Sequence, residues 1–234
     1  IDYKVRSFNE ITEKEKVVSL NCSGNQLTVL DLSQYPLLEV LYCGDSFRIE
    51  NGSSMRPRLT VLDLSHCPLL TELHCSGNKL TVLDLSHCPL LKELDCYGNE
   101  LTSLDLSHCP LLTELYCRNN KLTVLDLSHS PLLERLYCHN NKLTELTISQ
   151  CPLLKELYGW DNQLTVLNLS HCPLLEELYC KNNKLKQIII VLILQRDLNE
   201  NFGLTEGRCI CCNKKKVIKL TNTRICSNCF SLQL

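Results

Sequence analysis

Four cysteines near the C-terminus have the spacing of a metal site. Cys209 and Cys212 form one C-x2-C pair, and Cys226 and Cys229 form a second pair after 13 intervening residues. Four thiolates in two such pairs match the tetrahedral coordination of structural Zn²⁺, which leaves no position open for catalysis. Cys211 lies inside the first pair and could replace a neighbour or stay free. Two disulfides are the alternative that the spacing leaves open.

The segment around these cysteines is basic, although the whole chain has a net charge of only −2. Residues 206–234 hold six Lys or Arg residues against one acidic residue, whereas residues 1–205 are acidic. The basic residues near the cysteine pairs are Lys214, Lys215, Lys216, Lys219 and Arg224. Because such charges bind phosphate groups, nucleic acid is one candidate partner of this segment.

The other twelve cysteines recur at two regular positions, which we call the first and second cysteine columns. The first column is Cys22, Cys43, Cys75, Cys96, Cys117, Cys138 and Cys180, and the second is Cys67, Cys88, Cys109, Cys151 and Cys172. Gly159 interrupts the first column, and Tyr35 and Ser130 interrupt the second. These replacements indicate a packing role, since a free buried Cys behaves as a small apolar residue. Reduced thiols predict a reducing location inside a cell, either the cytoplasm or a virus particle.

Histidines also recur, each beside a Cys or a Ser of the second column. They are His66, His87, His108, His129 and His171. A thiol protease would need imidazole and sulfur on the same side, whereas neighbours in an extended chain point to opposite faces. We therefore predict exposed corner residues and no catalytic residues, so the chain is not expected to be an enzyme. A metal-binding or pH-sensitive histidine stripe is the alternative.

These columns arise from a 21-residue unit, exemplified by residues 73–93 (LHCSGNKLTVLDLSHCPLLKE), which is present in seven full copies and a partial one. Leu73 and Cys75 alternate with Glu72 and His74, which is the period of a strand with one buried face. Residues 82–85 alternate in the same way, so a second strand is predicted in each unit. Since one unit cannot bury its apolar side alone, the units are expected to stack into a solenoid.

Two further columns predict the bends of each coil. An inward asparagine ladder that satisfies backbone groups is predicted at Asn25, Asn78, Asn99, Asn120, Asn141, Asn162 and Asn183. The opposite corner is predicted at Pro36, Pro68, Pro89, Pro110, Pro131, Pro152 and Pro173.

The segment from Leu70 to Leu80 (LTELHCSGNKL) matches the pattern L-x-x-L-x-L-x-x-N-x-L, with Cys75 in one Leu position. The chain thus resembles the leucine-rich-repeat family, and its cysteine ladder is similar to 21-residue internalin-type repeats of bacteria and to repeats of large DNA viruses. The resemblance implies a β-rich, right-handed solenoid with parallel strands on one or both sides and little helix. It implies a non-enzymatic protein-interaction module. A structural role in an assembly such as a virus particle is an alternative.

The chain is expected to divide into four parts: an N-terminal flank or cap (1–16), the solenoid (17–195), a linker or cap (196–206) and a four-cysteine module that resembles a zinc ribbon (207–234). An insertion of 11 residues lies within 46–58. The apolar run at 188–194 has seven residues, which is too short to span a membrane.

Outward positions of the first predicted strand form a candidate protein-binding surface. Its residues are Glu72, Glu93, Glu114, Tyr116, Tyr137, Tyr158, Trp160 and Tyr179. Aromatic residues are enriched in interfaces, and Trp160 is the predicted anchor. The alternative is that the tyrosines only pair across strands. On the second strand the outward acids are Asp31, Asp63, Asp84, Asp105 and Asp126.

Overall fold

Each repeat forms a three-residue strand in which a buried Leu separates two outward residues. A computed structural model describes the backbone of residues 2–4, 11–25, 27–44, 58–185, 187–189, 217–220 and 223–226, and the side chains of 11–25, 27–44 and 58–185. The repeat strands are β2 (Ser19–Asn21), β3 (Val40–Tyr42), β4 (Glu72–His74), β5 (Glu93–Asp95), β6 (Glu114–Tyr116), β8 (Arg135–Tyr137), β10 (Glu156–Tyr158) and β12 (Glu177–Tyr179). The central residue of each is a leucine that is almost completely buried.

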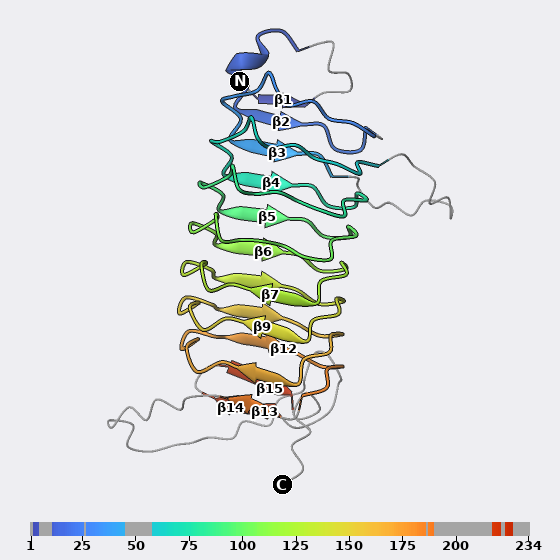
Figure 1. The fold of residues 1–234 in the computed structure, drawn as a ribbon. Helices are drawn as coiled ribbons and strands as arrows, with labels where there is room; N and C mark the ends of the chain where they lie inside the picture. Colours follow the sequence, from blue (N-terminus) through green and yellow to red (C-terminus); the bar gives the residue numbers. More distant parts are fainter. Residues whose placement is uncertain are drawn as a thin grey trace.

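These strands build one side of the solenoid as a single parallel sheet (Figure 1). Equivalent residues pair in register, so that Leu73 lies beside Leu94 and Leu94 beside Leu115. Strand β1 (Asp2–Lys4) pairs in parallel with β2 at one end of the sheet. At the other end β15 (Thr223–Cys226) pairs in parallel with β12, and β14 (Val217–Leu220) is antiparallel to β15.

The opposite side of the solenoid has fewer strands than the repeat pattern predicts. Strand β7 (Val124–Asp126) pairs with β9 (Glu145–Thr147), and β11 (Val166–Asn168) pairs with β13 (Gln187–Ile189). In the earlier coils the equivalent segments, such as 82–84, keep the alternating burial but form no strand. In these coils one backbone hydrogen bond joins neighbouring coils just before the segment, as where Glu100 N–H donates to Leu80 O at 2.9 Å. The hydrogen-bond ladder does not continue into the segment itself.

A single apolar core runs along the stack. It contains the leucines of both sides and all twelve cysteines of the two columns, and each of these cysteines is buried and free. A 3-10 helix at Lys14–Lys16 is the one helical segment among the described residues. No helix in the described part of the chain is long and apolar enough to cross a membrane.

The asparagine ladder is confirmed. Asn99 Nδ2 donates to the carbonyl oxygen of Cys96 in its own coil at 3.0 Å and to that of Cys75 in the preceding coil at 3.1 Å. Its Oδ1 accepts a hydrogen bond from the N–H of Leu80 at 3.0 Å. Asn78, Asn120, Asn141, Asn162 and Asn183 make the same three bonds. Each amide therefore fastens consecutive coils at the bend where the strand ends.

The proline corner is also present. Around Pro89, Cys88 N–H donates to Leu85 O at 2.9 Å and Leu91 N–H donates to Cys88 O at 3.2 Å, so two turns follow each other. At the asparagine bend, one residue of each coil whose bend is described has a positive φ. The residues there are Gly24, Gly77, Gly98, Asn119, Asn140, Asp161 and Asn182. Only Gly, Asn and Asp occur at this position because they tolerate the left-handed conformation best.

Candidate functional site

The outward residues of strands β4, β5, β6, β8, β10 and β12 form a continuous surface, which we call the strand face. The first strand position supplies Glu72, Glu93, Glu114, Arg135, Glu156 and Glu177, and the third supplies His74, Asp95, Tyr116, Tyr137, Tyr158 and Tyr179. All are at least partly exposed. Because parallel strands lie about 4.8 Å apart, equivalent side chains of consecutive coils are in contact distance.

The four tyrosines of this face form an aromatic stack. The ring centroids of Tyr137 and Tyr158 are 4.3 Å apart with an interplanar angle of 7°. Tyr116 lies 5.0 Å from Tyr137 on one side, and Tyr179 lies 4.6 Å from Tyr158 on the other. The edge of Trp160 meets Tyr158 at 5.7 Å. The structure thus brings together the five aromatic residues that the sequence singled out.

Glutamates of the first position hold the tyrosine hydroxyls. Tyr116 donates to Glu114 Oε2 and Tyr137 donates to Glu156 Oε2, both at 2.5 Å. Tyr158 donates to Glu177 in the same way. Burial, followed by the bond to Glu156, raises the pKa of Tyr137 to about 12. The hydroxyls therefore stay protonated. The tyrosines pair across strands, as the alternative interpretation predicted, and their side chains are also partly exposed, so the protein-binding role of this face stays a prediction.

Arg135 is a feature of this face that the sequence analysis missed. It occupies the glutamate position of β8, and its guanidinium bridges Glu114 of the preceding coil and Glu156 of the next. The Nε–Oε1 distance to Glu156 is 3.3 Å. The signal was available, since Arg135 is the only basic residue at this position of the described repeat strands. Its single positive charge is shared by Glu114 and Glu156, so the carboxylates next to the aromatic stack keep a net negative charge.

The part of the strand face on β4 and β5 lacks such a cation. Glu72 and Glu93 are paired in register, and Asp95 lies opposite His74. His74 stacks on Tyr42, with ring centroids 4.4 Å apart. Burial raises the pKa of Glu93, and the neighbouring carboxylates of Glu114, Glu72 and Asp95 raise it further, whereas His74 lowers it. Like charges in contact thus accumulate at this end of the face.

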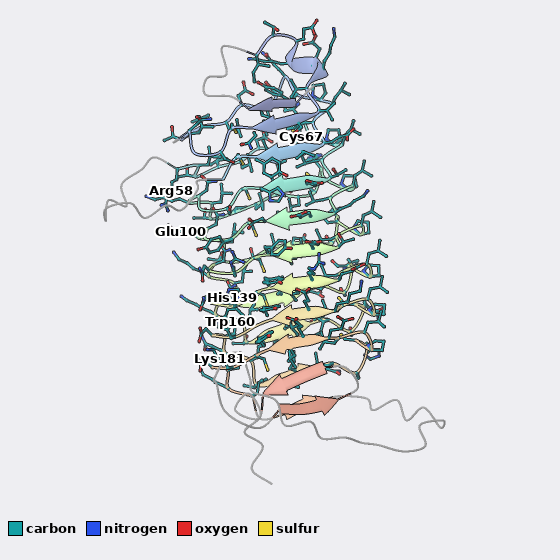
Figure 2. The ribbon with its side chains drawn as sticks, turned by 180° about the vertical axis from the view of Figure 1, so that it is seen from behind. Arg58, Cys67, Glu100, His139, Trp160 and Lys181 are labelled. Atoms are coloured by element: carbon teal, nitrogen blue, oxygen red, sulfur yellow. The ribbon has the colours of Figure 1, made fainter. Side chains whose placement is uncertain are left out.

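Trp160 does not stand free at the edge of the strand face. Its ring stacks on His139 of the preceding coil, with centroids 3.7 Å apart. Figure 2 shows the two side chains one above the other on the same edge of the solenoid. His139 is only 7% exposed, and burial lowers its pKa to about 4, with Arg118 acting in the same direction. Sequence reasoning missed this buried histidine because the residue type at its position varies from coil to coil.

The depressed pKa of His139 predicts a pH dependence of stability. The folded chain requires a neutral imidazole, so its stability is fully present above the ordinary pKa of 6.5 and is lost as the pH falls through about 4. We expect a loss of about 2 kcal/mol that His139→Tyr abolishes, since Tyr97 occupies the same position in another coil. Urea unfolding of both chains at pH 7 and pH 4 measures it. Equal losses in the two chains would contradict it.

The outward acids of the second side have a structural use. Asp84 Oδ1 accepts a hydrogen bond from the N–H of Ser86 at 2.9 Å, which lowers the pKa of the carboxyl. Asp31, Asp63, Asp105 and Asp126 bond the second residue after them in the same way. These acids are exposed, yet each carboxylate is engaged in its own turn, which is the local bonding that favours Asp and Asn in turns.

The histidine column lies at exposed corners, as predicted. His66, His87, His108, His129 and His171 are all exposed, whereas the neighbouring residues of the second cysteine column are buried. In two coils the ring accepts or donates a bond to the preceding serine, as at His171 Nδ1 and Ser170 Oγ, 2.8 Å apart. Imidazole and thiol point in opposite directions, so these pairs form no catalytic dyad.

The predicted metal site falls mainly outside the described residues. Cys209, Cys212 and Cys229 lie outside them, as do Lys214, Lys215 and Lys216. Cys226, Lys219 and Arg224 belong to β14 and β15, of which the backbone alone is described. The hairpin of these two strands connects the two cysteine pairs in sequence. Residues 45–57, which hold most of the insertion, also lie outside the described part.

Comparison with known proteins supports the repeat assignment. A family model described as "Leucine Rich repeats (2 copies)" matches residues 68–111. The functional domain of InlJ from Listeria monocytogenes, which includes a cysteine ladder, is 36% identical and matches 75% of this chain and 39% of its own, with a TM-score of 0.63. The leucine-rich effector YopM from Yersinia pestis is 29% identical over 76% of this chain and 47% of its own, with a TM-score of 0.65.

A further similar structure is YopM from Yersinia enterocolitica, which is 30% identical over 74% of this chain and 35% of its own, with a TM-score of 0.59. The chain therefore spans less than half the length of these solved structures. No curated protein matches the chain.

Proposed function

Because the chain is a leucine-rich-repeat solenoid with a cysteine ladder, we propose that it is a non-enzymatic module whose strand face binds another protein. The fold is typical of protein-interaction modules, since a stacked sheet presents one long surface. The observation that carries the proposal is the aromatic stack of Tyr116, Tyr137, Tyr158 and Tyr179, partly exposed and bordered by glutamates. Aromatic residues dominate the energy of protein interfaces.

The chemistry of this face fits a basic segment of the partner. The rings of the aromatic stack and the carboxylates of Glu156 and Glu177 lie side by side. A guanidinium or ammonium group that approaches them would contact an aromatic face and a carboxylate together. Arg135 already shows the carboxylate part of this preference within the chain, because it is held between two of the glutamates.

Charge reversal at one glutamate tests the proposal. Glu156→Lys removes the acceptor of Tyr137 and a partner of Arg135 in the middle of the strand face. We expect affinity for the partner that the wild-type chain captures, identified and quantified by mass spectrometry, to fall at least about tenfold. The matched control is Glu145→Lys, because Glu145 is an exposed glutamate on the opposite side, in β9. Equal capture by both variants would show that the strand face is not the binding surface.

We also propose that Cys209, Cys212, Cys226 and Cys229 bind one structural Zn²⁺ ion. The support is their C-x2-C spacing, together with the β14–β15 hairpin, which leads from the first pair to Cys226 at the end of β15. Such an ion would stabilise a segment that is too short to build an apolar core of its own.

A further inference from the structure

The N-terminal half of the strand face holds a cluster of three potential ligands on two adjacent strands. Glu72 and His74 belong to β4, and Glu93 belongs to β5. One ligand atom from each lies within 4.8 Å of the other two, and His74 Nε2 is 3.6 Å from Glu93 Oε1. All three side chains are half-buried, so the cluster is set into the surface and does not project into solvent.

The imidazole of His74 has an unsatisfied nitrogen at the centre of this cluster. Nε2 is sealed from solvent and has no hydrogen-bond partner. Its separation from Glu93 is longer than a hydrogen bond, and the ring is held in place by its stack on Tyr42. A buried polar atom without a partner costs free energy, so a fixed nitrogen facing two carboxylates is a favourable position for a ligand.

The charge of the site is also uncompensated. Glu72, Glu93 and Glu114 stand in register on consecutive strands, and the one guanidinium on this face, Arg135, reaches only Glu114 and Glu156. No Lys or Arg ion pair is formed by Glu72 or Glu93 among the described side chains. The nearby Asp95 adds a further negative charge, although its Oδ1 already accepts a hydrogen bond from Tyr97 N–H.

From this geometry we infer that Glu72, His74 and Glu93 form a binding site for a divalent transition-metal ion, for which Zn²⁺ is the best fit. One imidazole and two carboxylates suit Zn²⁺, whereas Ca²⁺ and Mg²⁺ prefer oxygen ligands alone. Two carboxylates and a neutral imidazole balance the charge of the ion. This site is separate from the four-cysteine site, and it does not depend on the proposed protein-binding function.

The distances are consistent with this ion. Zn²⁺ binds nitrogen and oxygen at about 2.0–2.2 Å, so two tetrahedral ligand atoms are separated by about 3.3–3.6 Å. The 3.6 Å between His74 Nε2 and Glu93 Oε1 is close to that separation. The Glu72 ligand atom lies within 4.8 Å of the other two, so a shift of at most about 1.5 Å brings it to that separation. Three protein ligands leave the fourth position to water or to a group of a bound partner.

A zinc titration of the full chain tests the inference. The chain is first loaded with Zn²⁺ and desalted, so that tightly held zinc is retained, and is then titrated with further Zn²⁺ against a chromogenic chelator at pH 7.5. We expect the wild type to bind one more equivalent than His74→Tyr, and we expect Glu93→Gln to weaken that equivalent at least about tenfold. His74→Tyr preserves the fold, because Tyr is the residue at this position in five other coils.

The matched control is His87→Tyr, which removes an exposed corner histidine and should leave the titration unchanged. A second readout is the ¹H NMR signal of the His74 imidazole, which should shift with the additional equivalent. Equal zinc uptake by the wild type and His74→Tyr would overturn the inference. It would also be overturned if His87→Tyr, and not His74→Tyr, lost the additional equivalent of Zn²⁺. Thermal unfolding of the three variants without zinc checks that each is folded.

Discussion

Asn120→Ala is expected to lower the free energy of unfolding by about 2–4 kcal/mol, although it removes no apolar contact. Asn120 Nδ2 donates to the carbonyl oxygens of Cys117 and Cys96, and Oδ1 accepts from Leu101 N–H. The alanine would leave the N–H of Leu101 without a partner in a site that is only 8% exposed for the wild-type residue. The carbonyl oxygens of Cys117 and Cys96 would each lose one of two amide donors, because Asn141 and Asn99 also bond them. A buried unsatisfied group costs about 1–3 kcal/mol and each lost hydrogen bond about 0.5–1.5 kcal/mol, and relaxation and water entry reduce the total.

The measurement is equilibrium unfolding in urea, compared with a control at the next residue. Lys121→Ala removes the exposed ion pair with Glu100, whose Nζ–Oε2 distance is 2.7 Å. A surface pair of this kind contributes about 0–1 kcal/mol. If the two variants differed by less than about 1 kcal/mol, the asparagine ladder would not be what holds the coils together at this bend.

The asparagine ladder was predictable because repetition removes the ambiguity of a single residue. One asparagine after a strand indicates only a turn, whereas six at a spacing of 21, from Asn78 to Asn183, indicate a position whose environment recurs from coil to coil. The same argument identified the buried cysteine columns and the leucines between outward residues. At each of these positions, the backbone geometry of the coil determines the residue type.

Contacts between unlike residues in consecutive coils could not be predicted in the same way. The direction in which Arg135 extends, towards Glu114 and Glu156 together, depends on side-chain rotamers that the sequence does not specify. The burial of His139 depends on the Trp160 ring that covers it, and this pair occurs in one place only. The cluster of Glu72, His74 and Glu93 likewise combines two columns, which were analysed separately.

The acids on the second side show a different limit of the prediction. Asp84 and its equivalents were read as outward surface residues, and they are exposed, but their role is set by the serine two residues later. The D-x-S spacing was visible in the sequence, and Asn168 makes the same bond to Ser170. The second strand was predicted in every coil because apolar and polar residues alternate there. This alternation indicates which side chains are buried, but burial alone does not determine whether the hydrogen bonds between neighbouring coils continue along the segment.

Thiol reactivity is expected to divide the 17 cysteines into three groups. Burial raises the pKa of Cys88 and Cys138 to about 12, from an ordinary value of 9.0. At pH 8 this lowers the thiolate fraction about 1,000-fold, and the packed core also blocks access of the reagent. The twelve column cysteines should therefore react with a disulfide reagent only after unfolding.

The C-terminal cysteines should respond to metal instead. With Zn²⁺ bound at the proposed four-cysteine site, we expect one rapidly reacting thiol, that of Cys211. A strong chelator should raise this number to five by releasing Cys209, Cys212, Cys226 and Cys229, and denaturant should then expose the remaining twelve. If the chelator did not change the number of rapidly reacting thiols, the zinc site would be contradicted. If more than five thiols reacted rapidly in the folded chain, the burial of the cysteine columns would be contradicted. The two outcomes are distinct because metal removal and unfolding act on different cysteines.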